Sequence, residues 1–513
     1  MRHTRTILIG ILAISLMGLY LSSIAPGLTW ANYGSDGGDL IAAAATGGVA
    51  HPSGYPLYLL LARLFQFLPI GSLAFRTNLL SAVTVTLAAL LVFELTARSL
   101  PLSSGQPNWS VGLASAYAFG LAPLVWSQAV ITEVYGVQVL FVVVILFLSS
   151  VPLPSPFTPH RLDLCLGLAF GLGMGIHLTT ILLLPLLFSA LPESQPRFPS
   201  SLRRIGWMGA GLLVYLTLPL RALREPPINW GNPVTLDGFR WLVTAGPYQD
   251  QLLTLNSALV WERLRVVAAL LLDQAGLPGL ILAALGMVFF FKSGSLHRNA
   301  IWMMAAFSAF AVVYGTPDSF VYLLPVCLGF SIWIGIGLAG IMPVLPQRLS
   351  RLGPYLSPGF ILFLFLLIGN HLPLVDASRD LRAETFGREV LARAPQDAII
   401  FARGDKAIFT MWYFHFALKE RPDAAIVATE LLGFDWYQQT LHATYPELEL
   451  PGPFPFAERL AALNPARPVC FVEYMEEARI QCRAAVDVNS TRLIQFPQLS
   501  FISQLKGLSG NHN

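Results

Sequence analysis

Long apolar stretches recur along most of the chain, and short polar segments separate them. They begin at residue 7 and end at residue 371, and many approach the ~20 residues with which an α-helix crosses a ~30 Å hydrocarbon core. Beyond residue 376 the apolar runs become short, as in an ordinary globular domain. The pattern therefore predicts a polytopic α-helical membrane domain over residues 1–375 and a small domain over residues 376–513.

Basic residues orient the predicted helices, because Lys and Arg are enriched in cytoplasmic loops. Starting with Arg2 and Arg5 inside, the chain crosses the membrane about eleven times, if 163–190 forms two short passes that meet near His177. Residues 57–68 are too short to span comfortably and predict an interfacial helix. This topology places the N-terminus in the cytoplasm and the C-terminal domain outside.

The C-terminal segment reads as a small α/β domain, because short apolar runs alternate with helical patterns. The helices are predicted at 379–394 and 410–417, and the strands at 398–402, 424–428 and 469–472. Cys470 and Cys482 could form a disulfide if this domain faces an oxidising compartment, and the sequence leaves that pairing open.

The amino-acid composition excludes several classes of protein. Of the 513 residues 55% are hydrophobic and only 12% charged, and the mean hydropathy is +0.61, which excludes a water-soluble protein. A net charge of +3 gives no indication of a nucleic-acid partner. The four cysteines lack zinc-site spacing, and no glycine-rich nucleotide-binding loop follows a strand.

Only Lys and Arg positions orient the helices, yet many other polar residues fall on the outer face, which indicates a single outward-facing site. They are Asp36, Asp39, His51, Glu133, His177, Arg221, Asn229, Trp230 and Asp318.

The densest polar cluster comprises residues 33–39 and 51–56. Asp36 and Asp39 are three residues apart and can share one face, and a carboxylate in a partly dry site can act as a general base. The alternative is that either Asp merely caps the following Ala-rich helix. No metal site is required, although the two carboxylates could hold one divalent cation.

Four sequence motifs, two of which contain residues of this cluster, are similar to those of a known family. Residues 37–45 (GGDLIAAAA), 51–58 (HPSGYPLY) and 126–135 (WSQAVITEVY), with Gly404-Asp405, strongly resemble the domain-of-unknown-function family numbered 2723. Its animal members are transmembrane protein O-mannosyltransferases of the GT-C superfamily. This chain departs from the family pattern in having Asp39 where Glu is usual and Ser53 where Pro is usual.

The resemblance implies a GT-C-like membrane glycosyltransferase in the plasma membrane. Such an enzyme moves a sugar, with mannose favoured, from a polyprenyl-phosphate donor to an acceptor hydroxyl of a protein or glycan, most naturally Ser or Thr. It also implies that Asp36 or Asp39 is the base of an inverting displacement, with His51 and Tyr55 nearby. The leaving phosphate needs positive charge, for which Arg76 and Arg221 are the candidates and Arg63 a weaker third, unless they only anchor the interface.

The remaining candidates have alternatives as well. Glu133 could orient the acceptor, and His177 is more often a residue that satisfies a backbone carbonyl. Asn229 and Trp230 lie in a rigid polar loop where the indole could stack on a sugar or simply mark the interface. At the level of function, a transporter or lipid flippase and an inactive glycan- or partner-binding protein remain the alternatives.

Overall fold

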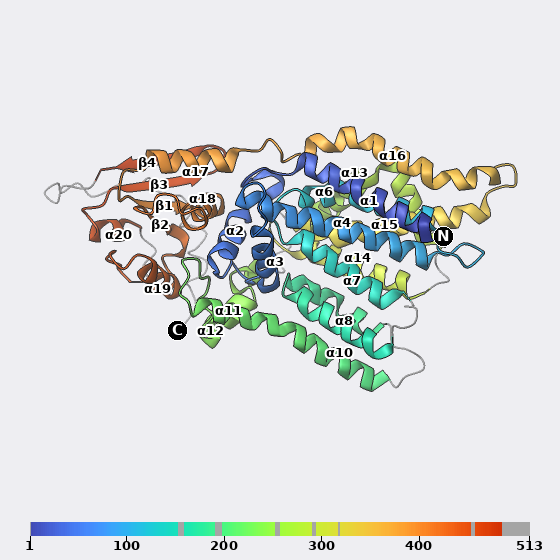
Figure 1. Ribbon diagram of the computed structural model, residues 1–513, viewed down its shortest axis with the longest axis horizontal. Helices are drawn as coiled ribbons and strands as arrows, with labels where there is room; N and C mark the ends of the chain where they lie inside the picture. Colours follow the sequence, from blue (N-terminus) through green and yellow to red (C-terminus); the bar gives the residue numbers. More distant parts are fainter. Residues whose placement is uncertain are drawn as a thin grey trace.

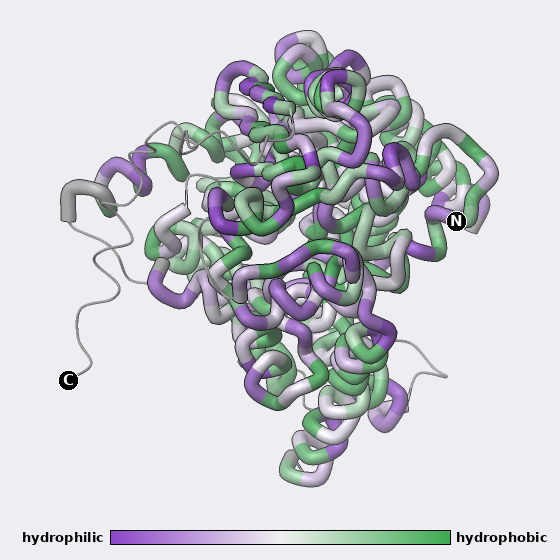
Figure 2. Tube along the Cα trace, turned by 90° about the vertical axis from the view of Figure 1, so that its left-hand side faces the viewer, coloured by the Kyte–Doolittle hydropathy of each residue, from purple (hydrophilic) through white to green (hydrophobic). Residues whose placement is uncertain are grey.

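The computed structural model describes residues 2–151, 158–189, 197–251, 257–289, 294–316, 319–452 and 457–484. The molecule is elongated, with a bundle of long helices at one end and a small sheet with its own helices at the other (Figure 1). The N-terminus lies at the end of the bundle far from the sheet (Figure 1). Viewed from the sheet end, hydrophilic and hydrophobic stretches alternate along the chain (Figure 2).

The first four helices bring the chain to the sheet end and back. They are α1 (Arg2–Ser23), α2 (Gly37–Thr46), α3 (Pro56–Gln66) and α4 (Leu73–Ser99). The side chain of Ser72 accepts a hydrogen bond from the backbone N–H of Phe75 and so caps α4. The short helix α3 corresponds to the predicted interfacial helix.

The rest of the bundle follows the predicted order with breaks inside several spans. Its helices are α5 (Trp109–Gly120), α6 (Pro123–Ala129), α7 (Tyr135–Ser150), α8 (Pro159–Met174), η2 (Leu178–Leu183), α9 (Leu184–Ser189), α10 (Arg197–Leu212), α11 (Thr217–Ala222), α13 (Ser257–Phe289), α14 (Ser295–Val313), α15 (Leu324–Ile341) and α16 (Gly353–Val375). The chain bends by 67° between α5 and α6, where Pro123 begins the new helix. The predicted break near His177 lies between α8 and η2.

In the described part of the chain, seven helices are long and apolar enough to cross a membrane, or eight if the bent α5–α6 pair counts as one span. The predicted number of about eleven depends in addition on shorter apolar helices, among them Tyr135–Ser150 and Leu178–Ser189. Helix α15 is buried throughout and contacts α5, α13 and α14, so it forms the centre of the bundle. The polar loop that contains Asn229 and Trp230 leads into a further helix, α12 (Leu236–Val243).

The C-terminal part is a four-stranded sheet in the order β2-β1-β3-β4. Its strands are β1 (Ile399–Arg403), β2 (Ala425–Ala428), β3 (Val469–Tyr474) and β4 (Ala478–Arg483). The first three are parallel and coincide with the predicted strands, whereas β4 is antiparallel to β3 and was not predicted. Helices α17 (Arg382–Arg393), α18 (Asp405–Trp412), α19 (Asp435–Thr444) and α20 (Ala457–Leu463) accompany the sheet.

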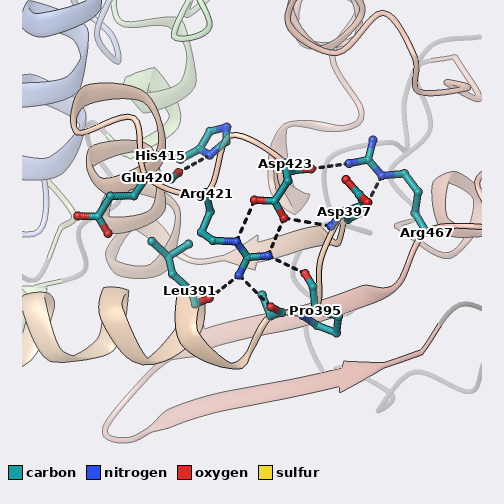
Figure 3. A network of polar contacts seen from close by, with 9 residues as sticks. Leu391, Pro395, Asp397, His415, Glu420, Arg421, Asp423 and Arg467 are labelled. Carbon is teal, nitrogen blue, oxygen red and sulfur yellow. Dashed lines mark hydrogen bonds and ion pairs between the residues drawn. The ribbon is translucent and has the colours of Figure 1, made fainter.

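One arginine ties the sheet to helix α17. The Arg421 guanidinium donates to the carbonyls of Leu391, Ala394 and Pro395 at the helix end and forms two hydrogen bonds with Asp423 (Figure 3). These bonds hold the pKa of Asp423 well below its usual range. Asp423 also accepts a hydrogen bond from the backbone N–H of Asp397. This bond holds the segment that leads into β1 against the segment that leads into β2.

Cys470 and Cys482 face each other across β3 and β4 and form a disulfide. The sequence left this pairing open. The bond joins the buried strand β3 to the edge strand β4, most of which is exposed.

The C-terminal part shares a hydrophobic core with the short helices α2 and α3. Leu40 and Ile41 of α2 are buried in the same cluster as Phe409 and Trp412 of α18. The contact is so close that a Cβ atom on Gly38 would lie 2.3 Å from the carbonyl oxygen of Phe409. Only glycine therefore allows α18 to reach α2 in this arrangement.

Candidate active site

A cavity of about 750 Å³ lies where the membrane helices meet the C-terminal part. Its walls come from the loops before α2 and before α3, from the segment around η2, from residues 244–249, from the end of α14 and from the start of α18. One end is polar and is formed by Asp36, His51, Asp405 and Lys406. The other end is aromatic and apolar.

The two carboxylates of the first outer loop occupy different environments. Asp39 is fully buried, and its carboxylate accepts the backbone N–H and the ring Nδ1–H of His51 at 2.9 and 2.7 Å. The Asp36 side chain is 35% exposed, lines the cavity, and places Oδ2 3.5 Å from His51 Nε2. Asp36 occupies the N-cap position of α2 without a capping hydrogen bond from its side chain, and Asp39 binds His51 instead. Capping therefore does not account for either residue.

A tight turn brings His51 between the two carboxylates. The backbone N–H of Gly54 donates to the carbonyl of His51 at 2.8 Å, and Gly54 has φ +82°, a conformation that favours glycine. Tyr55 follows with φ +42° and brings its hydroxyl within 3.1 Å of His51 Nε2.

The charges around His51 decide its protonation state. Burial lowers its pKa, but Asp36, the hydrogen bond to Asp39 and the charge of Asp39 outweigh burial and raise the pKa to about 9. At neutral pH the ring is therefore an imidazolium held between two carboxylates.

The loop that contains Asn229 and Trp230 supports Asp39 from behind. The Trp230 indole N–H donates to Asp39 Oδ1 at 3.2 Å. Asn229 pairs with Val49 in a single parallel bridge, which holds this loop against the turn before His51. Trp230 contacts the rings of Phe409 and other aromatic residues and is not part of the cavity wall. The structure thus places these residues behind the site and not at a sugar-stacking position.

Two residues of α18 complete the polar end. Burial and the charge of Asp36 raise the pKa of Asp405 to about 6, while His51 acts in the opposite direction. Lys406 follows, and its ammonium lies 5.7 Å from the ring centroid of Trp30 and 5.6 Å from that of Tyr474.

Aromatic residues from the membrane helices form the opposite end of the cavity. The ring of His177 lies 5.7 Å from that of Tyr135 and 5.6 Å from that of Tyr322. Beyond them the wall is apolar and includes Ile181 and Phe310. The Nδ1 atom of His177 accepts the backbone N–H of Thr179, so this ring caps η2 and does not satisfy the expected carbonyl.

Three arginines expected near the leaving phosphate lie elsewhere. Arg76 donates to the carbonyls of Gln66, Ile70 and Gly71. Arg221 donates to the carbonyl of Gly48, and Arg63 to that of Ala45. These three guanidinium groups anchor loops, and none lines the cavity.

Glu133 does not line the cavity. Glu133 is buried behind the cavity wall, where its charge adds to the effect of burial in raising the pKa of Tyr55 and Tyr58. Asp318 lies outside the described residues. Among the residues described, no group of three or more His, Cys, Asp or Glu side chains could hold a metal ion. Asp39 in particular is already bonded to His51 and Trp230.

Sequence reasoning missed several residues of the wall. Lys406, Tyr135 and Tyr322 were not singled out, although Tyr135 ends one of the quoted motifs and Lys406 follows Gly404-Asp405 directly. The position of these two residues within or directly beside the motifs was the signal in the sequence that could have indicated them. The distance between residues 36 and 405 along the chain hid the fact that both line one cavity.

Comparison with known proteins agrees with the motifs. Residues 36–193 match the family model of the protein O-mannosyl-transferase TMEM260 N-terminal domain, and residues 383–454 match TMEM260-associated domain 2. The predicted family resemblance is confirmed. The second match contains α18 and with it Asp405 and Lys406.

Two curated relatives resemble most of this chain. The protein O-mannosyl-transferase TMEM260 of Mus musculus is 27% identical over an alignment of 454 residues that covers 82% of this chain and 62% of that protein. The protein O-mannosyl-transferase tmem260 of Dictyostelium discoideum is 24% identical over an alignment of 476 residues that covers 82% of this chain and 57% of that protein. The chain therefore spans about three fifths of the length of these relatives.

Solved structures show the fold. The structure of ArnT from Cupriavidus metallidurans bound to undecaprenyl phosphate has a TM-score of 0.55 at 14% identity and covers 90% of this chain and 92% of that one. The apo structure of the same protein has a TM-score of 0.56 at 12% identity, with 91% and 92% covered. The GT-C-like membrane fold predicted from the resemblance is confirmed.

Proposed function

We propose that this protein is a membrane glycosyltransferase that moves a sugar from a polyprenyl-phosphate donor to a hydroxyl group of an acceptor on the outer face of the membrane. The observation that carries the proposal is the array Asp36, His51 and Asp39 at the polar end of a cavity whose other end is apolar. Mannose as the sugar, and Ser or Thr of a protein as the acceptor, follow from the names of the two relatives.

The two ends of the cavity suit the two parts of such a donor. A polyprenyl chain is apolar, and Ile181, Leu182 and Phe310 offer it an apolar wall contributed by membrane helices. The sugar and the phosphate would then lie toward Asp36 and His51. The aromatic rings of Tyr135 and Tyr322 stand between the two ends, where they can contact the sugar.

Asp36 is the base in this proposal because, of the two carboxylates of the first outer loop, it is the one that lines the cavity. It accepts the proton of the acceptor hydroxyl while that oxygen bonds to the anomeric carbon and the bond from this carbon to the phosphate oxygen breaks. The electron pair leaves with the phosphate, and the sugar inverts. Asp39, buried and bonded to His51 and Trp230, positions the imidazolium and does not touch substrate.

Replacement of Asp36 tests the proposal. We expect Asp36→Asn to lower the rate of transfer by at least about 100-fold, the lower end of the range for a general base, while the protein stays folded at the assay temperature. The assay follows labelled mannose from polyprenyl-phosphate mannose to a Ser/Thr peptide in membranes that contain the full chain. The exposed Asp237 of the outer loop provides the control, Asp237→Asn.

Replacement of Asp39 distinguishes its role from that of Asp36. Asp39→Asn should lower both activity and the melting temperature, because it weakens the bonds that a buried carboxylate accepts from His51 and Trp230. Full transfer by Asp36→Asn would refute its role as the base. Absence of transfer by the unaltered protein to peptide and glycan acceptors alike would refute the enzymatic proposal.

A further inference from the structure

We infer that Lys406, delivered by the C-terminal part of the chain, binds the phosphate of the lipid donor. This inference rests on the proposed function and assigns one of its binding residues. Among the described residues that line the cavity, Lys406 is the single Lys or Arg. The cation that the leaving phosphate requires therefore comes from α18 and not from the membrane helices.

The surroundings of Lys406 leave its charge available. Within the described part of the chain no carboxylate lies within 4.0 Å of its ammonium, and no side chain or carbonyl accepts a hydrogen bond from it. Two ring faces hold it instead, those of Trp30 and Tyr474, whose centroids are 4.2 Å apart. An ammonium placed in this way keeps its three N–H groups for an anion.

The other positive charge of the cavity is already matched. The His51 imidazolium bonds to Asp39 at 2.7 Å and faces Asp36 at 3.5 Å, so two carboxylates balance it. A phosphate diester that enters this end meets the carboxylates of Asp36 and Asp405 as well. Without Lys406 the polar end would repel the donor.

The charge also matters during the reaction. When the bond between the anomeric carbon and the phosphate oxygen breaks, the electron pair stays on that oxygen and the phosphate gains one negative charge. A cation at the phosphate is therefore bound more tightly in the transition state than in the ground state. Lys406 should consequently affect both the affinity for the donor and the rate of transfer.

The packing of α18 keeps this cation in position. Helix α18 lies against α2, and its Phe409 backbone contacts Gly38, the residue before Asp39. Trp30 stands in the loop that leads into α2, and its backbone N–H donates to Asp380 at 3.0 Å. The base and the proposed phosphate ligand are thus fixed to each other through the shared core of α2 and α18.

Binding of undecaprenyl phosphate to the full chain in lipid nanodiscs tests the inference without any acceptor or sugar. We expect Lys406→Met to weaken this binding by at least about tenfold, the loss of one hydrogen bond to a charged group, and Lys406→Arg to retain most of it. Lys419→Met is the matched control, because Lys419 is an exposed lysine of the same part of the chain. It should bind as the unaltered protein does.

The outcomes distinguish this inference from the proposed function. Wild-type affinity in Lys406→Met overturns the inference whatever the transfer activity is, and so does equal weakening by Lys419→Met. Loss of binding in Lys406→Met supports it even if no sugar is transferred. If Lys406→Met melts at a lower temperature than the unaltered protein, the comparison of Lys406→Gln with Lys406→Arg decides, since both side chains are polar and donate hydrogen bonds but only Arg carries a positive charge. Asp36→Asn, which removes a carboxylate that repels the phosphate, should bind the lipid at least as tightly as the unaltered protein and fail only in transfer.

Discussion

The two aspartates of the first outer loop show how much the surroundings decide at the scale of a residue. Their spacing of three residues predicted that both could face one cleft. Which of them faces the cavity depends on Trp230, which is 191 residues away from Asp39 and bonds to it. Such a long-range partner has no local signal in the sequence. The carboxylates were therefore predictable and their separate environments were not.

The charge on His51 makes stability depend on pH. Its pKa is raised from 6.5 to about 9, so the imidazolium stabilises the folded protein fully below about pH 6.5, and this contribution disappears as the pH rises through about 9. The shift corresponds to roughly 3 kcal/mol. We expect the melting temperature of the purified protein to fall across this window, as measured in detergent between about pH 6 and 10.

Two histidine variants identify the cause of that decline. His51→Gln should melt at a lower temperature than the unaltered protein at neutral pH and lose most of the decline at high pH. His442→Gln, which alters an exposed histidine of α19, should retain it. If His51→Gln keeps the full decline, other groups are responsible.

At the scale of elements, apolar periodicity located most helices and three of four strands. It missed strand β4, whose side chains are largely exposed and polar, because the buried face that marks a strand is absent there. The bend of 67° between α5 and α6 has only Pro123 as its signal, since both helices are apolar. The contact of α18 with α2 joins helices far apart in sequence and could not be predicted from either pattern alone.

That contact gives a prediction for Gly38. Because a Cβ atom there would lie 2.3 Å from the Phe409 carbonyl oxygen, Gly38→Ala must move α18 away from α2. We expect a loss of about 1–3 kcal/mol in stability, typical of overpacking, together with weaker binding of the lipid phosphate because Lys406 moves with its helix. Melting temperature and undecaprenyl phosphate binding are the two measurements.

The neighbouring glycine is the control. A Cβ atom on Gly37 would find its nearest neighbour, the Thr132 carbonyl oxygen, at 3.4 Å, so Gly37→Ala should be tolerated. Equal effects of the two variants would mean that helix propensity or capping is responsible, not the contact with α18.

At the scale of the whole molecule, the membrane bundle and the sheet meet in one core and one cavity. The composition predicted both parts and the change near residue 376. It could not predict that α2 and α3 share their core with β1 and α18, because apolar residues do not specify their partners. The site accordingly combines Asp36 from the first outer loop with Lys406 from the other end of the chain.

This arrangement gives a prediction of which side of the membrane each end of the bundle faces. Arg5 and Arg98 both bond to Glu94 at the end of α1 and α4 that lies far from the sheet, and basic residues favour the cytoplasmic side. The disulfide between Cys470 and Cys482 lies in the sheet, and disulfides persist in oxidising compartments. Both observations favour an orientation in which the sheet and the cavity lie outside the cytoplasm.

Thiol labelling of intact cells tests that orientation. We expect a membrane-impermeant maleimide to label Cys470 and Cys482 only after treatment with an impermeant reductant, because both are oxidised and outside. The double variant Cys470→Ser, Cys482→Ser retains the free Cys165 and Cys327 of the membrane helices and should stay unlabelled under the same treatment. Labelling that required permeabilised cells would put the sheet in the cytoplasm. An acceptor and a base on that side would then be incompatible with transfer on the outer face, and the site would have to act on cytoplasmic substrates.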